Sequence, residues 1–414
     1  SYVKLNLMKS IFVQIASYRD PELVPTIKNL IEKSHNPENL KICIAHQYSE
    51  EDEWDRLDQF ADDGRFTVIQ IPHTESQGTC WARNQIQQHY NGEDYTLHLD
   101  SHHRFSSGWD SECINNIAKL QKQGFKKPML TSYCPAYELN KTAQKDNTAY
   151  GMKINKWKDG VSLFSPYAMP KTQAPVPTRF YSGHFAFTLG QFCKEVPHDP
   201  LMYFYGEEIS ISVRAYTHGY DLFVPHNPVV WHQYIRDGRS KHWDDHKKWF
   251  ERDNLSKSRT RQLLGVNGEV CSPCNKKTFK EHGLGEDRTL KDYELYSGIS
   301  FKDQTITNRC QQNLPPPGHE ADSVYYQNKE YQVRINKHDF LYEDCAFGVL
   351  VFEDINGIVV YNNTITKDEI QALKSLNNSY MTIVRNLSGQ VPSRYLVWSY
   401  SASHGWGDKV ISYF

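Results

Sequence analysis

The sequence lacks any long hydrophobic run. No stretch of about 18 apolar residues occurs in its 414 residues, which predicts that no segment spans a membrane. A strong net charge is also missing, because 47 Lys and Arg residues nearly balance 49 Asp and Glu residues. The formal net charge of −2 gives no global field that would attract nucleic acid or an acidic membrane surface. These absences argue against a membrane-spanning or nucleic-acid-binding protein.

A regular disulfide framework is missing too. Nine cysteines fall at irregular spacings, and their odd number favours reduced thiols and a cytoplasmic location. The first ten residues lack the apolar core of a signal peptide, in agreement with that expectation. Cys271 and Cys274 form half of a metal-binding signature, but no obvious second half accompanies them, so a zinc site is the weaker interpretation.

The first 135 residues alternate strand and helix patterns at short spacing. Apolar runs at residues 11–16, 41–45, 66–71 and 95–99 predict buried strands, and segments with helical patterns separate most of them. This alternation is typical of an α/β fold with a parallel, doubly wound sheet. In such sheets ligands bind at the carboxyl ends of the strands, so we expect the functional residues there.

The rest of the chain predicts a loop, a linker and a second domain. Residues 140–178 are polar and contain prolines, which indicates an irregular loop that either contributes to a binding site or is a simple insertion. The run Pro-Pro-Pro-Gly at residues 315–318 marks a linker, and β-rich segments follow it. We therefore predict a large domain over residues 1–314 and a smaller, mostly β domain over residues 319–414.

A carboxylate and an imidazole stand at the end of one predicted strand. Because alternate side chains of an extended segment point the same way, Asp100 and His102 can bind one divalent cation together. His232 closes a second apolar run, residues 228–232, and is the third candidate ligand. Such ligands with open positions suit Mn²⁺ or Mg²⁺ better than the sulfur-rich shell of a structural zinc. The alternative is a strand-end cap, a surface histidine and an ordinary hydrogen-bonded His232.

Two further groups have chemistry suited to a substrate site. Glu207 and Glu208 open a predicted helix after Gly206, where they either complement the helix dipole or receive a substrate hydroxyl. Arg83 follows a glycine-containing turn, and its guanidinium can pair with phosphate or form a surface salt bridge. A divalent cation stabilises a departing diphosphate, so the metal site predicts transfer from a nucleotide sugar.

Several segments together resemble a known enzyme family. They are similar to the retaining GT-A-type polypeptide glycosyltransferases, and above all to the cytoplasmic hydroxyproline-polypeptide α-N-acetylglucosaminyltransferases, which modify an adaptor subunit of SCF ubiquitin ligases. The resemblance covers roughly residues 10–302. It is carried by residues 15–23, 100–105, 205–214, 283–293 and 298–301, and by His232.

The resemblance implies a GT-A-like nucleotide-binding sheet flanked by helices. It also implies a UDP-sugar donor, foremost UDP-GlcNAc, and a divalent cation, Mn²⁺ or Mg²⁺. Members of the family retain the anomeric configuration, and the departing β-phosphate oxygen itself would take the proton of the acceptor hydroxyl. The implied site residues are Asp100, His102 and His232 at the metal, Ser17 and Arg19 beside the uridine and ribose, Arg83 near the diphosphate, and Glu207 and Glu208 facing donor sugar and acceptor.

The predicted β-rich domain leaves the acceptor open, because it has no recognised counterpart in the eukaryotic members. The acceptor is either a (hydroxyproline) polypeptide or, as for related bacterial sequences, a surface glycan. Two other classes of function also fit the residues. One is a non-catalytic carbohydrate-binding protein with aromatic platforms in the C-terminal domain, and the other is a metal-dependent hydrolase with an activated water. Association into a homo-oligomer is left open.

Overall fold

Two compact units make up the chain. The computed structural model describes residues 9–139, 146–235, 237–266, 278–318, 328–388 and 391–414. The first unit falls within residues 1–152, 166–263 and 271–296, and the second within residues 153–165, 264–270 and 297–414. The predicted boundary between residues 314 and 319 stays a prediction. Cys271 and Cys274 lie outside the described residues.

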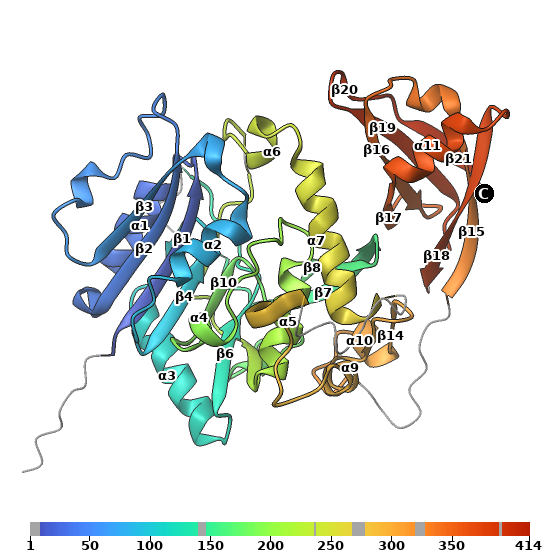
Figure 1. The fold of residues 1–414 in the computed structure, drawn as a ribbon. Helices are drawn as coiled ribbons and strands as arrows, with labels where there is room; N and C mark the ends of the chain where they lie inside the picture. Colours follow the sequence, from blue (N-terminus) through green and yellow to red (C-terminus); the bar gives the residue numbers. More distant parts are fainter. Residues whose placement is uncertain (1–8, 140–145, 236, 267–277, 319–327, 389–390) are drawn as a thin grey trace, which may run out of the picture. The chain divides into compact units, whose positions relative to one another are not determined.

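An eight-stranded sheet forms the centre of the first unit (Figure 1). Its outer strand β3 is followed by β2, β1 and β4, and then by β10, β6, β11 and β9. In that order the strands are β3 (Phe66–Pro72), β2 (Leu40–Tyr48), β1 (Ile11–Tyr18), β4 (Tyr95–Leu99), β10 (Phe185–Leu189), β6 (Lys127–Thr131), β11 (Tyr220–Val224) and β9 (Val176–Pro177).

The sheet is mixed, which corrects the expectation of a parallel sheet. β3, β2, β1 and β4 pair in parallel, and so do β6 and β11. β10, however, runs antiparallel to both β4 and β6, and β9 runs antiparallel to β11. An apolar strand pattern carries no information on direction, which depends on the path of the connection before the strand. The fold class itself, α/β with a smaller and mostly β C-terminal region, is confirmed.

Helices cover both faces of the sheet in the first unit. Val13 of β1 points to one face and packs in a cluster with Ile27 of α1 and Trp109 of α3. Phe12 points to the other face and packs with Ile86 of α2. Successive residues of a strand alternate between faces, so β1 needs apolar residues on both sides and reads as a continuous run. Within the described residues of both units the α-helices are α1 (Leu23–Lys33), α2 (Thr79–Gln87), α3 (Trp109–Lys122), α4 (Phe192–Glu195), α5 (Glu207–Thr217), α6 (His242–Asp245), α7 (Trp249–Leu264), α9 (Leu290–Ser297), α10 (Asn308–Gln311) and α11 (Lys367–Ser375).

The stretch predicted as an irregular loop is partly ordered. β7 (Tyr150–Lys158) and β8 (Val161–Ala168) pair with each other. Their connection contains Asp159, a residue of the second unit. The Asp159 carboxylate accepts hydrogen bonds from the backbone N–H and the hydroxyl of Thr364 in the same unit. The polar composition of residues 140–178 therefore hid a hairpin whose tip belongs with the C-terminal residues. Among the described helices, none is both long and apolar enough to cross a lipid bilayer.

The C-terminal part of the chain is mostly β, as predicted (Figure 1). Phe352 is fully buried in its core and stacks on Tyr361 at a centroid distance of 4.7 Å. Helix α11 contributes Ile370 and Leu373 to the same cluster. The strands are β15 (Asn328–Asn336), β16 (Cys345–Glu353), β17 (Val359–Ile365), β18 (Tyr380–Ser388), β19 (Arg394–Ser401), β20 (Gly405–Trp406) and β21 (Val410–Tyr413).

Replacing Phe352 with alanine is expected to lower the free energy of unfolding of this part by about 3–5 kcal/mol, because the cavity cannot fully collapse. Calorimetry of the full chain measures it. The control is Ile355→Ala, since Ile355 is 87% exposed. An unfolding profile in which Phe352→Ala matches Ile355→Ala would contradict this description of the core.

Candidate active site

A short two-stranded ribbon brings the predicted metal ligands together. β4 ends at Leu99, the chain turns through Asp100 and His102, and β5 (His103–Phe105) then pairs antiparallel with β12 (Val230–His232). In this register His232 lies opposite His103. The pairing places two segments 130 residues apart in the sequence beside one another at the carboxyl end of β4.

The three side chains offer donor atoms at short mutual distances. Nε2 of His232 lies 3.1 Å from Asp100 Oδ2 and 3.1 Å from His102 Nε2, and His102 Nε2 lies 3.9 Å from Asp100 Oδ2. A divalent ion with ligands at about 2.1 Å separates adjacent donors by about 3 Å. The donor set of one carboxylate and two imidazoles therefore fits a single cation such as Mn²⁺ or Mg²⁺.

The outer hydrogen bonds of His102 leave its Nε2 available. Asp20 is almost fully buried, and its Oδ2 lies 2.7 Å from His102 Nδ1. Because a carboxylate accepts, this contact favours the proton on Nδ1 and a lone pair on Nε2. Ser101 Oγ and Arg239 Nη1 donate to the same Asp20 oxygen. Arg239 Nη1 also lies 2.7 Å from Nδ1, and with the proton on Nδ1 this is a contact between two donors and not a hydrogen bond. A carboxylate behind a histidine is the arrangement that orients metal-ligating imidazoles.

Charged groups around Asp100 keep it ionised. Burial alone would raise its pKa, but the hydrogen bond with His232 and the electrostatic effects of His102 and Arg83 outweigh burial and hold the pKa of Asp100 well below its usual range. Arg83 Nη2 donates to Asp100 Oδ1 at 2.9 Å, so Oδ2 is the oxygen that faces the histidines. His103 lies outside the donor set, because its Nδ1 bonds to the Trp231 carbonyl and its Nε2 accepts from the Asp100 backbone N–H.

Gly206 determines where the two glutamates stand. Its φ of +103° is a conformation that suits glycine, and a Cβ there would lie 1.9 Å from Thr260 Oγ1. Helix α5 begins directly after it, which places both carboxylates in the first turn. Both also lie near Gly183, since a Cβ at that position would be 3.5 Å from Glu207 Oε1 and 3.7 Å from Glu208 Oε1.

The two glutamates differ in their surroundings. Glu207 is buried and its Oε1 lies 3.1 Å from His198 Nε2. Glu208 is partly exposed, accepts from the Gly183 backbone N–H at 3.0 Å and accepts from the Tyr133 hydroxyl at 3.2 Å. Burial raises the pKa of Glu208 to about 8, although the Gly183 N–H opposes the shift, and the charge of Glu207 adds to it. Glu208 thus exchanges a proton near neutral pH.

The residues predicted beside the nucleotide lie at the end of β1. Ser17 is fully buried, and its hydroxyl has no hydrogen-bond partner among the described residues. Arg19 donates to both carboxylate oxygens of Asp52 and, through Nη1, to Asp245 at 3.1 Å. Arg83 is only 1% exposed and donates to Asp100 and to the Leu99 carbonyl, so in this structure it supports the predicted metal ligand Asp100.

Other residues around the site escaped the sequence interpretation. Asp20 follows Arg19 directly, but a single carboxylate at a strand end carries no spacing signal. Tyr133 follows an apolar strand pattern and Arg239 lies in a polar segment, but neither pattern indicates a partner, so only the folded chain shows their contacts with Glu208 and Asp20. His198 had no predicted role, because nothing in its neighbourhood indicates that it meets Glu207.

Comparison with known proteins identifies the family. The model of the family described as glycosyltransferase (GlcNAc) matches residues 10–62 and 56–303. No curated protein matches the sequence.

Similar solved structures are distant. One is GalNAc-T7 crystallised with UDP, GalNAc and Mn²⁺, at 16% identity and a TM-score of 0.48, covering 70% of this chain and 56% of GalNAc-T7. Another is TarS from S. aureus, at 9% identity and a TM-score of 0.37, covering 98% of this chain and 77% of TarS. Residues 1–349 of TarS with UDP-GlcNAc give 10% identity and a TM-score of 0.35, covering 66% and 79%. These similarities are too low to carry an argument about function. The family match, by contrast, extends over most of the chain, and the chain therefore belongs to the glycosyltransferase (GlcNAc) family.

Proposed function

We propose that this protein is a metal-dependent, retaining glycosyltransferase that moves a sugar, foremost GlcNAc, from a UDP-sugar to a hydroxyl acceptor. The observation that carries the proposal is the convergence of Asp100, His102 and His232. Two imidazole Nε2 atoms 3.1 Å apart, beside a carboxylate oxygen, form a poor contact unless a proton or a cation lies between them. A divalent ion bound there supplies positive charge beside the diphosphate leaving group.

The chain's own residues have separate tasks in this proposal. Ser17 and Arg19 bind the nucleoside at the end of β1, where the buried Ser17 hydroxyl still has hydrogen-bonding capacity. Arg83 keeps Asp100 charged and oriented. When ionised, Glu208 accepts a hydrogen bond from a hydroxyl of the donor sugar, with Glu207 beside it. By resemblance, a departing phosphate oxygen takes the acceptor proton. The acceptor oxygen attacks the anomeric carbon from the face that the phosphate leaves, so the anomeric configuration is retained.

We propose a polypeptide acceptor with hydroxyproline, in line with the resemblance, and a reducing, cytoplasmic setting. Seven cysteines within the described part of the chain are free and buried, which fits such a setting.

A panel of UDP-sugars incubated with the protein and Mn²⁺ tests the donor. We expect UDP release to be fastest from UDP-GlcNAc and to stop with EDTA. Absence of release from every donor, or release that EDTA leaves unchanged, would contradict the proposal.

The hydrogen bond behind His102 gives a prediction about metal affinity. Replacing Asp20 with asparagine removes the charged acceptor of the Nδ1 proton, and we expect Mn²⁺ to bind about 10–100-fold more weakly. Titration calorimetry with Mn²⁺ and UDP measures the affinity. The matched control is Asp55→Asn, because Asp55 is equally buried and bonds to His46, which lies outside the donor set. Equal Mn²⁺ affinity in both variants would show that Asp20 does not act through His102.

A further inference from the structure

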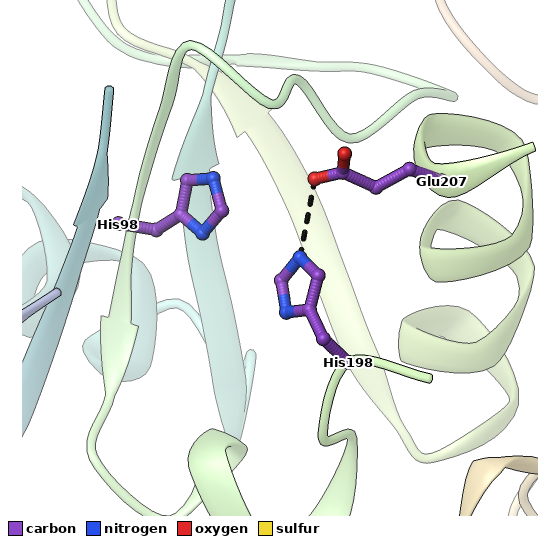
Figure 2. A group of neighbouring side chains, drawn as sticks. All are labelled: His98, His198 and Glu207. Atoms are coloured by element: carbon purple, nitrogen blue, oxygen red, sulfur yellow. Dashed lines mark hydrogen bonds and ion pairs between the residues drawn. The ribbon is translucent and has the colours of Figure 1, made fainter. Parts of the chain in front are cut away.

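A second cluster of histidine and carboxylate lies beside the glutamate pair. Figure 2 shows His98 on its strand, His198 on the segment before α5 and Glu207 in the first turn of α5. Donor atoms of the three residues lie within 4.8 Å of one another. The rings of His98 and His198 stack, with centroids 5.3 Å apart and planes inclined by 9°. Two histidines and a glutamate could bind a metal ion. Whether they do depends on which ring nitrogens carry a proton and which keep a lone pair.

Gln87 fixes the proton of His198. The Gln87 Oε1 atom accepts a hydrogen bond from the His198 backbone N–H at 2.7 Å, which sets the orientation of the amide. The amide nitrogen of Gln87 must then donate to His198 Nδ1, 2.9 Å away. A neutral imidazole whose Nδ1 accepts carries its proton on Nε2. That proton is donated to Glu207 Oε1 at 3.1 Å, and Nε2 keeps no lone pair for a metal (Figure 2).

The remaining histidine cannot complete a metal site. His98 donates from Nε2 to the Gly183 carbonyl at 2.9 Å, and only its Nδ1 lacks a partner among the described residues. Burial lowers the pKa of His198, so its ring is neutral at neutral pH. One imidazole lone pair and one carboxylate fall short of the three protein ligands of typical metal sites.

Helix α2 supports this cluster and the first site with one polar face. Cys80, Arg83, Asn84 and Gln87 follow the spacing of one helix face, i, i+3, i+4 and i+7. Burial and the nearby Glu207 raise the pKa of the Cys80 thiol, and Asn84 donates to the His198 carbonyl at 2.9 Å. Arg83 holds Asp100, as described above. This face of α2 therefore contacts both Asp100 at the first site and the cluster of His198 and Glu207, and it positions side chains at both.

We propose that Gln87 and His198 are positioning residues of the transferase site. Gln87 sets the tautomer of His198, and His198 holds the Glu207 carboxylate in one orientation beside Glu208. The catalytic consequence rests on the proposed function, whereas the tautomer is a property of the folded chain alone. The two parts can therefore fail separately.

The tautomer is tested by ¹⁵N NMR of histidine-labelled full-length protein, with the His198 signals assigned by their loss in His198→Gln. We expect a neutral ring with the proton on Nε2 and a bare Nδ1 at pH 7–8. A proton on Nδ1 would overturn the proposal. So would metal-bound shifts of His198 after Zn²⁺ is added to the His102→Ala variant, in which the first site is disabled.

The positioning role is tested by steady-state kinetics of UDP release. Gln87→Leu and His198→Leu are expected to lower kcat about tenfold, because a buried acceptor loses its donor, and to leave KM for the donor within about twofold. His198→Gln keeps a donor at the same reach and is expected to restore most of kcat. Gln88→Leu is the matched control, since Gln88 is the next residue of α2 and is exposed.

Three outcomes separate the two proposals. Wild-type kcat in Gln87→Leu and His198→Leu would overturn the positioning role and leave the transferase proposal standing. Loss of kcat in His198→Gln equal to that in His198→Leu would also overturn it, because the donor to Glu207 would not matter. A wild-type protein that releases no UDP from any donor, yet shows the expected tautomer, would overturn the proposed function while supporting the hydrogen-bond chain.

Discussion

Replacing Asp100 with asparagine is expected to lower sugar transfer about a thousandfold or more, since charge stabilisation at a metal site is worth several kcal/mol. Asparagine keeps the shape of the side chain but removes the negative charge that balances the cation. Arg83 would then face a neutral amide instead of a carboxylate. UDP release in the presence of saturating Mn²⁺ and UDP-GlcNAc measures the effect, and calorimetry with Mn²⁺ should show a parallel loss of metal affinity.

The control for this substitution is Asp110→Asn. Asp110 is 1% exposed and accepts hydrogen bonds from Ser34 Oγ and from the backbone N–H groups of His35 and Asn36. It stabilises a turn outside the donor set, so its loss should lower the melting temperature and leave turnover at low temperature near the wild-type value. If Asp100→Asn retains normal turnover, or if both variants lose turnover equally, Asp100 does not hold a catalytic cation.

Replacing Glu208 with glutamine is expected to lower kcat/KM about 10–100-fold, the usual worth of a hydrogen bond to a charged group. Glutamine preserves the bond from the Gly183 N–H but can never ionise. The wild-type kcat/KM should rise with pH as Glu208 ionises, with a midpoint near its pKa of about 8. Glu208→Gln should lose this rise. Identical pH profiles for the two proteins would remove Glu208 from the reaction.

The pH dependence of stability should run opposite to that of activity: stability of the wild-type protein falls as Glu208 ionises, and Glu208→Gln should weaken this fall. The pKa of Glu208 is raised by folding, from 4.5 to about 8, so the folded protein holds a proton that the unfolded chain releases between these pH values. Its contribution to stability is therefore greatest below about pH 4.5 and falls as pH rises to 8, by roughly 1.4 kcal/mol per pH unit within the window. Glu208→Gln should show a shallower fall in metal-free denaturation curves. A wild-type curve no steeper than that of the variant would contradict the raised pKa.

Much of the fold follows from local patterns in the sequence. The runs at residues 11–16 and 95–99 are mostly apolar because β1 and β4 are covered on both faces, and such runs mark central strands. Asp100 and His102 could be found because a polar pair directly after a central strand lies at the edge where ligands bind. His232 could be predicted as a third candidate ligand because it also follows directly on an apolar run, residues 228–231.

The remaining features depend on contacts between distant segments. The direction of β10 follows from the course of the chain before it, and the strand's own residues do not encode it. Arg83 illustrates the same limit at the site. A flexible turn before a helix suggested a phosphate contact, which stays a prediction, but the sequence did not indicate that Arg83 points inward from α2 and donates to Asp100. The spacing of Cys80, Arg83, Asn84 and Gln87 places them on one helix face, but polar residues at this spacing usually face solvent, so the sequence alone did not indicate that the face is buried.

The central claim is that Asp100, His102 and His232 bind one catalytic cation. Anomalous diffraction from crystals grown with Mn²⁺ and UDP tests it most directly. The account predicts one strong peak at about 2.0–2.3 Å from Asp100 Oδ2 and from Nε2 of both histidines, the distances typical of divalent cations in proteins. A peak at His98, His198 and Glu207 instead, or no peak beside Asp100 at saturating Mn²⁺, would contradict it.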